Sequence, residues 1–158
     1  MDETARLAGV DDVHALRRLA AASREDLAPK RGGDVVDRLD PHRDDPGSRL
    51  IDALSRPDSS VYLGTIDGTA VGYGLLTVKT VSDGSLHAVV DELFVEEDAR
   101  EVGVGEALID ALIGDAKSRG ARAIQSLALP GDRATKNFFE SQGMVARAIV
   151  VHRWLDED

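Results

Sequence analysis

Alternating and helical patterns of hydrophobic residues divide the chain into strands and helices. A weak alternation over residues 4–8 predicts a first strand. Apolar residues spaced three and four apart predict a helix after it, which Asp11 can cap and whose buried stripe is Val13, Leu16, Leu19 and Ala20. Residues 25–47 lack this regularity, contain several prolines and glycines, and allow only a short helix over 35–39. Loops of that length are often functional.

Three antiparallel strands are predicted next, after a short helix over 48–54. Two β-rich runs flank Asp67-Gly68, a dipeptide typical of a hairpin turn, and a second turn leads to a third run. Gly120 and Gly143 fall where helix C-caps are expected. The predicted elements from the first hairpin onward are strands 61–66, 70–78 and 86–95, a helix 103–118, a strand 123–129, a helix 133–142 and a final strand or strand pair 144–155.

These elements predict one α/β domain over residues 1–158 with a mixed sheet. The 29 acidic and 19 basic residues give a formal charge of −10, which disfavours nucleic acid and an anionic membrane as partners. This charge would attract a cationic substrate weakly, or it serves solubility alone. The chain has no cysteine, so a thiolate nucleophile is excluded. Neither a signal peptide nor a membrane-length apolar run is visible, so we expect a cytoplasmic protein.

A glycine-containing loop is the strongest chemical signal. The segment Arg100-Glu101-Val102-Gly103-Val104-Gly105 lies between a predicted strand and a predicted helix. A helix start offers unpaired N–H groups, and glycine lets a phosphate approach the backbone closely. The alternative is a tight turn without a ligand. The dinucleotide fingerprint is excluded because its third glycine is Leu108 here, and no P-loop sequence occurs in the chain.

Two motifs resemble those of the GCN5-related N-acetyltransferase (GNAT) superfamily. The central motif is matched by Val90-Asp91-Glu92-Leu93-Phe94-Val95, followed by Arg100-x-x-Gly-x-Gly and Ala107-Leu108. The closing motif is matched by Phe138-Phe139-Glu140-Ser141-Gln142-Gly143-Met144. The order of predicted elements also fits the superfamily, so the resemblance covers the whole chain.

The resemblance implies a fold, a cofactor and a reaction. The expected fold is a mixed, mostly antiparallel sheet flanked by helices and splayed between the fourth and fifth strands, with acetyl-CoA in the cleft. The cofactor's pantetheine arm would pair with Leu93, Phe94 and Val95. Its pyrophosphate would bind the loop that Arg100 opens, at Glu101, Val102, Gly103, Val104, Gly105 and Glu106. A primary amine of a small molecule or protein would attack the thioester directly, in a pocket built from residues 19–54. A homodimer is compatible with the family.

A general base is expected because an amine must lose a proton to react. Asp91 and Glu92 lie on the strand that would line the cleft, and neighbouring strand residues point to opposite faces. We predict Glu92 as the base, because many amine-acetylating relatives carry an acid there, with Asp91 as the second candidate. Either could instead be a solvated edge residue. His87 shares the face of Asp91, and no histidine spacing indicates a metal, so we predict none.

Some residues depart from the family's pattern. Glu101 and Glu106 place carboxylates beside the expected pyrophosphate, although carboxylates at a helix start also complement its dipole. Phe139 stands where many members have a tyrosine that can protonate the departing thiolate, and Asp132 replaces a usual asparagine. For Phe138 we expect a core-packing role. These departures keep open a second hypothesis, a non-catalytic acyl-CoA sensor or regulatory module.

Overall fold

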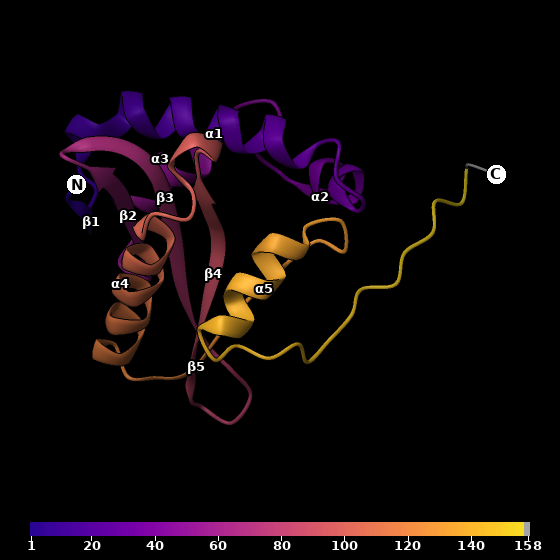
Figure 1. Ribbon diagram of the computed structural model, residues 1–158. Helices are drawn as coiled ribbons and strands as arrows, with labels where there is room; N and C mark the ends of the chain where they lie inside the picture. Colours follow the sequence, from indigo (N-terminus) through magenta and orange to yellow (C-terminus); the bar gives the residue numbers. More distant parts are fainter. Residues whose placement is uncertain (157–158) are drawn as a thin grey trace.

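A five-stranded mixed sheet forms the centre of the molecule (Figure 1). The computed structural model describes residues 1–156. The strands lie in chain order, with antiparallel pairing from β1 to β4 and parallel pairing between β4 and β5. They are β1 (Glu3–Leu7), β2 (Ser59–Ile66), β3 (Thr69–Thr80), β4 (Leu86–Val95) and β5 (Ala121–Ser126). The predicted mixed, mostly antiparallel sheet is therefore confirmed.

Helices cover both faces of the sheet, and each face has its own core. One core joins α1 and α3 to inward residues of β2, β3 and β4, among them Leu63, Tyr73 and Phe94. The other joins α4 and α5 to Leu76, Val90 and neighbouring residues. The helices are α1 (Val13–Leu27), α2 (Gly33–Leu39), α3 (Ser48–Ala53), α4 (Val104–Ser118) and α5 (Arg133–Ser141), with short 3-10 turns η1 (Val10–Asp12) and η2 (Glu97–Ala99).

The predicted boundaries differ from the structure in the C-terminal part of the chain. β5 begins at Ala121, two residues earlier than predicted, because Gly120 ends α4 in the left-handed region with φ of 84° and the strand starts at once. The predicted strand or strand pair over 144–155 is wrong. Residues 145–154 are irregular and pair with no strand in the described part of the chain. Strand propensity alone supplies no pairing partner, and a β-strand is held by its neighbour's backbone.

A β-bulge in β4 sets the geometry of the region predicted to be functional. Leu75 of β3 pairs with Glu92, and Leu76 pairs with Val90, so Asp91 is the extra residue. A bulge breaks the strict alternation of side chains along a strand. Val90, before the bulge, therefore packs in the core beside α4, whereas Phe94, after the bulge, packs in the core beside α1.

None of the helices in the described part of the chain has the length and apolar character needed to cross a membrane.

Candidate functional site

The fourth and fifth strands separate, as the family resemblance implies. Their parallel pairing runs from Leu86 to Val90 on β4 and ends at Ser126 on β5, whose Oγ donates to the Val90 carbonyl at 2.9 Å. Beyond Val90, β4 continues to Val95 with β3 as its strand neighbour, and no described strand pairs with its other edge. That edge, over residues 91–95, has no partner strand and can pair with an extended ligand, although the Val95 carbonyl already accepts a hydrogen bond from Arg100.

The loop after β4 leads to a helix start without a side-chain cap. Gly103 precedes α4 with φ of 107°, and Glu101 also adopts positive φ, at 65°. No side chain caps this helix, and the Gly103 carbonyl accepts its first intrahelical bond, from the Ala107 N–H. The N–H groups of Val104, Gly105 and Glu106 therefore lack intrahelical partners. An anion is stabilised at such a helix start by these donors and by the helix dipole.

The side chains of the loop leave this helix start accessible. Glu101 and Glu106 are both exposed, while Val104 is buried beneath the first turn. Gly105 lies against an aromatic ring, since a Cβ at this position would stand 3.4 Å from the Phe138 ring. Gly103 adopts positive φ, and Gly105 does not.

Arg100 is held by neighbouring groups of the protein. Its Nε donates to the Val95 carbonyl at 2.8 Å, and its guanidinium pairs with Asp26 of α1 at 3.2 Å. Lys30 forms an ion pair with Asp26 at 3.0 Å and another with Asp132, at the start of α5, at 3.3 Å. These ion pairs link the loop, α1 and α5. The guanidinium of Arg100 thus has an internal partner, and its expected cofactor role remains a prediction.

Both candidate carboxylates lie on the α1 and α3 side of the sheet. Glu92 accepts a hydrogen bond of 2.9 Å from the hydroxyl of Tyr73, a residue of the α1 core. Asp91 accepts one of 2.6 Å from Thr77 and lies 3.6 Å from the guanidinium of Arg49 on α3. The expectation that neighbouring residues point to opposite faces is wrong here, because Asp91 is the extra residue of the bulge.

Burial makes Glu92 a stronger base than a surface glutamate. Desolvation raises the pKa of its carboxyl above the usual value, while the hydrogen bond from Tyr73 and the charge of Arg49 oppose that rise. The pKa of Tyr73 is raised well above its usual value, chiefly by burial and then by the charge of Glu92. Tyr73 therefore remains a neutral donor, and one oxygen of Glu92 is held in place.

A cavity of 280 Å³ lies beside Asp91 on the same face. Its wall comes from β2, β3, β4, α3 and the segment before α3, which overlaps the region 19–54 predicted for the acceptor. The lining residues are Pro41, His42, Arg49, Asp52, Ala53, Arg56, Ser59, Leu75, Thr77, Lys79 and Asp91. The wall carries both cationic and anionic side chains, so it favours neither sign of ligand.

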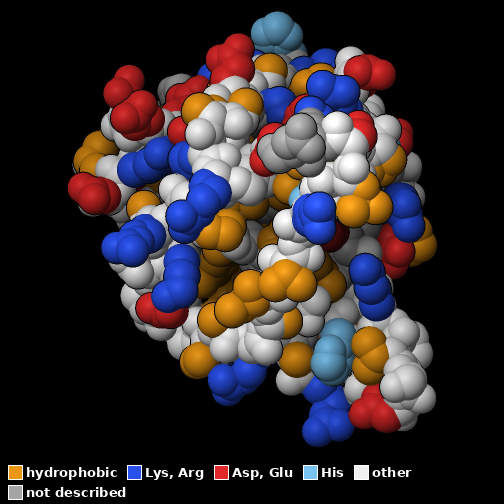
Figure 2. All heavy atoms as spheres, turned by 90° about the vertical axis from the view of Figure 1, so that its right-hand side faces the viewer, with side chains coloured by type: hydrophobic (Ala, Val, Ile, Leu, Met, Phe, Trp, Pro, Cys, Tyr) orange, Lys and Arg blue, Asp and Glu red, His pale blue; other side chains and the backbone are white. Residues whose placement is uncertain are grey.

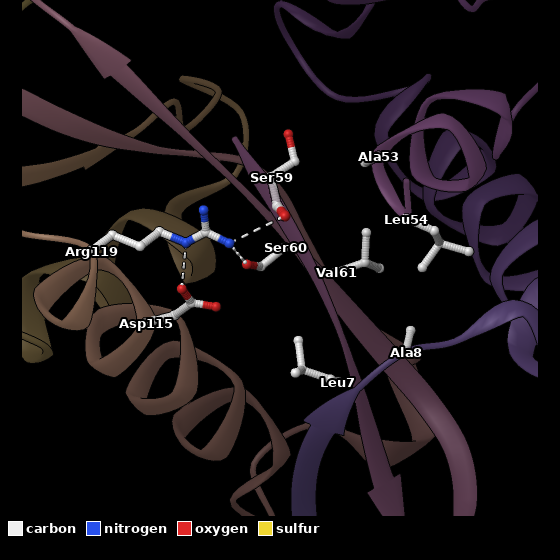
Figure 3. A pocket seen from close by; sticks show the side chains of 9 residues that line it. All are labelled: Leu7, Ala8, Ala53, Leu54, Ser59, Ser60, Val61, Asp115 and Arg119. Carbon is white, nitrogen blue, oxygen red and sulfur yellow. Dashed lines mark hydrogen bonds and ion pairs between the residues drawn. The ribbon is translucent and has the colours of Figure 1, made fainter. Parts of the chain in front are cut away.

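A second cavity, of 310 Å³, contains none of the predicted site residues (Figure 3). On one side of it, Arg119 donates to Asp115 of the same helix, at 2.7 Å, and to the Ser60 hydroxyl, at 2.8 Å. Tyr62 also donates to Asp115, at 2.9 Å. Because these polar groups bind one another, we assign this cavity a structural role.

The remaining candidates have structural partners. Phe139 is 7% exposed in the α4 and α5 core, and Phe138 packs beside it with ring centroids 5.8 Å apart. Asp132 caps α5 by accepting from Thr135, which lowers the pKa of its carboxyl against the opposing effect of burial. His87 pairs in register with Lys79 and makes neither a hydrogen bond nor an ion pair with Asp91. Within residues 1–156, no three His, Asp or Glu side chains gather as metal ligands would.

Sequence reasoning missed Tyr73, Thr77 and Arg49. Tyr73 and Thr77 belong to a strand whose pattern indicates core packing, and Arg49 is one of several arginines in the segment before β2. No local signal distinguishes them. The one hint for Tyr73 is general: the hydroxyl of a buried tyrosine usually needs a hydrogen-bond partner.

Comparison with known proteins identifies the family. The model of the acetyltransferase (GNAT) family matches residues 17–144. A tetramutant of the BH1408 protein from Bacillus halodurans has a similar fold, with a TM-score of 0.81 at 20% identity over 96% of this chain and 99% of that one. The ribosomal-protein-alanine N-acetyltransferase from Brucella melitensis biovar Abortus 2308 has a TM-score of 0.73 at 23% identity, over 98% of this chain and 100% of that one.

The aminoglycoside N-acetyltransferase AAC(6')-Iy in complex with CoA gives a TM-score of 0.72 at 19% identity, over 98% of this chain and 95% of that one. A search of curated proteins finds no match to the sequence. At these identities the solved structures establish the fold, and the family model adds membership over most of the chain. The separated strands, the uncapped helix start and the family match agree, and this chain belongs to the acetyltransferase (GNAT) family.

Proposed function

We propose that the protein transfers an acetyl group from acetyl-CoA to a primary amine of a small molecule or protein. Family membership supports acetyl transfer in general. The observation that carries the proposal is the continuous path from the free edge of β4 to the uncapped start of α4. An extended acyl arm and a pyrophosphate need these two features in this order.

The cofactor would be held mainly by the backbone. Its pantetheine amides would pair with residues 93–95 as an additional strand, and its pyrophosphate would accept from the N–H groups at the start of α4. Gly103 and Gly105 suit this role because neither has a side chain that could block the approach of phosphate. Glu101 and Glu106 are exposed, so their carboxylates need not point at the pyrophosphate.

Glu92 would accept the proton of the amine. The amine nitrogen forms a bond to the acetyl carbon, the carbon–sulfur bond breaks, and the sulfur departs with the bonding electrons. A thiol pKa near 8.5, by analogy with cysteine, lets the thiolate leave without an acid near neutral pH. Phe139 has no hydroxyl with which to protonate it. Asp91 stands beside the cavity and is the second candidate base.

Phe139 also favours the second hypothesis, a sensor that binds acyl-CoA without turnover. Its buried ring belongs to the core and carries no group that could take part in proton transfer. Such a module would keep the backbone site for the cofactor and lose the reaction.

One experiment separates the two hypotheses. The protein is incubated with acetyl-CoA and a panel of amines, and free thiol is measured. The panel includes an aminoglycoside and a peptide with an N-terminal alanine, since the names of two structural neighbours mention these acceptors. We expect thiol release with at least one amine. Binding of acetyl-CoA, measured by calorimetry, without release on any amine would favour the sensor.

A further inference from the structure

The cavity beside Asp91 contains an ion pair that makes no hydrogen bond. The guanidinium of Arg49 lies 3.6 Å from the carboxylate of Asp91, beyond the range of about 2.7–3.2 Å that an N–H···O bond needs. Within residues 1–156, Arg49 donates no hydrogen bond to any other group. Its side chain is 41% exposed, and a guanidinium carries several N–H donors in a planar fork that matches a carboxylate. These donors are therefore available to a ligand in the cavity.

The same guanidinium acts on the proposed base. Burial raises the pKa of Glu92, and the charge of Arg49 is one of the effects that oppose this rise. Glu92 follows Asp91 on β4, and both carboxylates lie on the α1 and α3 side of the sheet. One end of the cavity thus brings a cation together with two carboxylates.

The rest of the wall also carries unpaired groups of both signs. The side chains of Lys79 and Asp52 form neither an ion pair nor a hydrogen bond with any described residue. Arg56, by contrast, is held by Asp58 through two hydrogen bonds of 3.2 Å. A ligand with charge of one sign would leave the wall groups of that same sign without a partner. Figure 2 shows Lys and Arg side chains gathered on one face although the net charge is −10, so the net charge does not predict the ligand of a particular site.

The volume of the cavity limits the size of the ligand. Its 280 Å³ lies just below the range of about 300–1,000 Å³ that is usual for pockets of drug-sized molecules. A compact molecule with few polar groups fits such a space, whereas most of an oligosaccharide or a folded protein would remain outside. Charge and size together favour a small ligand that carries a cation and an anion on neighbouring atoms.

We propose that the acceptor is a free α-amino acid, with its carboxylate on Arg49 and its amine beside Asp91 and Glu92. This substrate class rests on the acetyl transfer proposed above. A single carbon separates the two groups of an α-amino acid, so they match a guanidinium and carboxylates that lie side by side. The amine nitrogen bonds to the acetyl carbon, the carbon–sulfur bond breaks, coenzyme A leaves as the thiolate, and Glu92 takes the amine proton. The products are an N-acetyl amino acid and coenzyme A.

Other amines lack one half of this match. An alkylamine has no group for Arg49, and the guanidinium repels its ammonium form. At a peptide N-terminus an amide replaces the carboxylate, so the charge-assisted hydrogen bond to Arg49 becomes a weaker one. Loss of a hydrogen bond to a charged group lowers affinity by about 10–100-fold. Arg49 would therefore select for the free acid.

Matched acceptors test the role of the carboxylate. Each common α-amino acid is compared with its carboxamide, which keeps the amine and the side chain but lacks the negative charge, and thiol release from acetyl-CoA is measured. We expect at least one amino acid to react with a kcat/KM about 10–100-fold above that of its carboxamide. The carboxamide has the less basic amine and more of it is neutral at a given pH, so its intrinsic reactivity opposes the expected preference. Turnover of carboxamides or alkylamines without such a preference would overturn the amino-acid assignment and leave acetyl transfer intact.

Binding separates this assignment from the reaction itself. Calorimetric titration of amino acids into the protein in the presence of coenzyme A needs no turnover. We expect the amino acid to bind and its carboxamide not to bind over the same range of concentration. Binding with this preference but without thiol release would overturn acetyl transfer and support the amino-acid site. Absence of binding by any amino acid would overturn the site.

Arg49→Gln removes the proposed partner of the carboxylate. Because loss of its charge also raises the pKa of Glu92 for every acceptor, the measured quantity is the ratio of kcat/KM for the amino acid to that for its carboxamide. This ratio should fall about 10–100-fold, to near unity, while Arg49→Lys, which keeps the charge, should retain part of it. Arg17→Gln is the matched control, since it removes an exposed arginine from an ion pair with Asp45 outside the cavity, and it should leave the ratio unchanged. A ratio that stays at the wild-type value in Arg49→Gln would overturn the amino-acid assignment.

Discussion

A single hydrogen bond prepares the proposed base. Tyr73 lies in the core with no exposed surface, and its hydroxyl holds one oxygen of Glu92. Burial raises the pKa of this glutamate, and the bond from Tyr73 limits that rise. A carboxylate with a raised pKa accepts a proton from an ammonium group more readily than one with the usual pKa.

Glu92→Gln should lower kcat/KM by about 10²–10⁴-fold, the usual range for loss of a general base. The loss should shrink at high pH, where solvent supplies neutral amine. Steady-state thiol release across a pH series measures both effects. Full activity of the variant near neutral pH would reject Glu92 and leave Asp91, His87 or water as the base.

The same variant should show a pH-dependent gain in stability. Because the folded-state pKa of Glu92 lies above its unfolded value, this group favours the folded state most below the unfolded pKa. That contribution is lost as the pH rises through the folded pKa. Glutamine at this position does not ionise, so Glu92→Gln does not lose stability as the pH rises, and its amide oxygen can still accept the hydrogen bond from Tyr73. Its free energy of unfolding should therefore exceed that of the wild type at neutral pH, with a difference that narrows in acid. Urea unfolding at both pH values measures it.

Tyr73→Phe should raise the pKa of Glu92 further, since it removes a hydrogen bond to the charged form. The acid limb of the pH profile of kcat/KM should then move to higher pH. Tyr62→Phe is the matched control, because it removes a tyrosine–carboxylate bond at the other cavity, to Asp115. A shift of equal size in both variants would mean that the effect does not come from Glu92.

At the scale of elements, the two ends of α4 provide a matched pair of glycines. Gly103 and Gly120 both have positive φ. A Cβ added at Gly103 would contact only the Glu3 side chain, at 3.9 Å, and a Cβ added at Gly120 would contact nothing within 4 Å. Valine at either position should therefore strain the backbone to a similar degree. Only Gly103 lies at the proposed pyrophosphate site, whereas Gly120 follows the opposite end of α4.

Gly103→Val should abolish acetyl-CoA binding, while Gly120→Val should bind as the wild type does. Calorimetric titration with acetyl-CoA compares the two, and circular dichroism checks that both variants fold. Equal affinity in the two variants would mean that the loop only caps the helix. Loss of binding in both would point to a general effect on α4 instead of a blocked phosphate site.

At the scale of the whole molecule, acetyl-CoA should stabilise the fold. A ligand that binds only the folded state adds about 2.7 kcal/mol at a hundredfold excess over Kd. For a domain of this size, each kcal/mol raises Tm by about 2–4 °C. Thermal unfolding with and without acetyl-CoA should therefore differ by several degrees. An unchanged Tm at millimolar acetyl-CoA would contradict the cofactor assignment.

The sequence by itself determined the elements and the family. Hydrophobic periodicity, the Asp67-Gly68 turn and the glycine caps are local signals, and they predict most strands and helices within a few residues. The motif around Gly103 and Gly105 predicts a loop before a helix because turn geometry is also local. The separation of β4 and β5 came from the family resemblance, and the structure confirms it.

Only the tertiary structure decided which side chains meet. The bulge at Asp91 depends on the register between β3 and β4, which no local pattern fixes, and it places both carboxylates on one face. Tyr73 and Arg49 reach this site from separate elements, so their role depends on long-range packing. Residues 145–154 show the converse. Their sequence has the pattern of a strand, but a strand forms only by pairing with a neighbouring backbone, and no strand within residues 1–156 pairs with them.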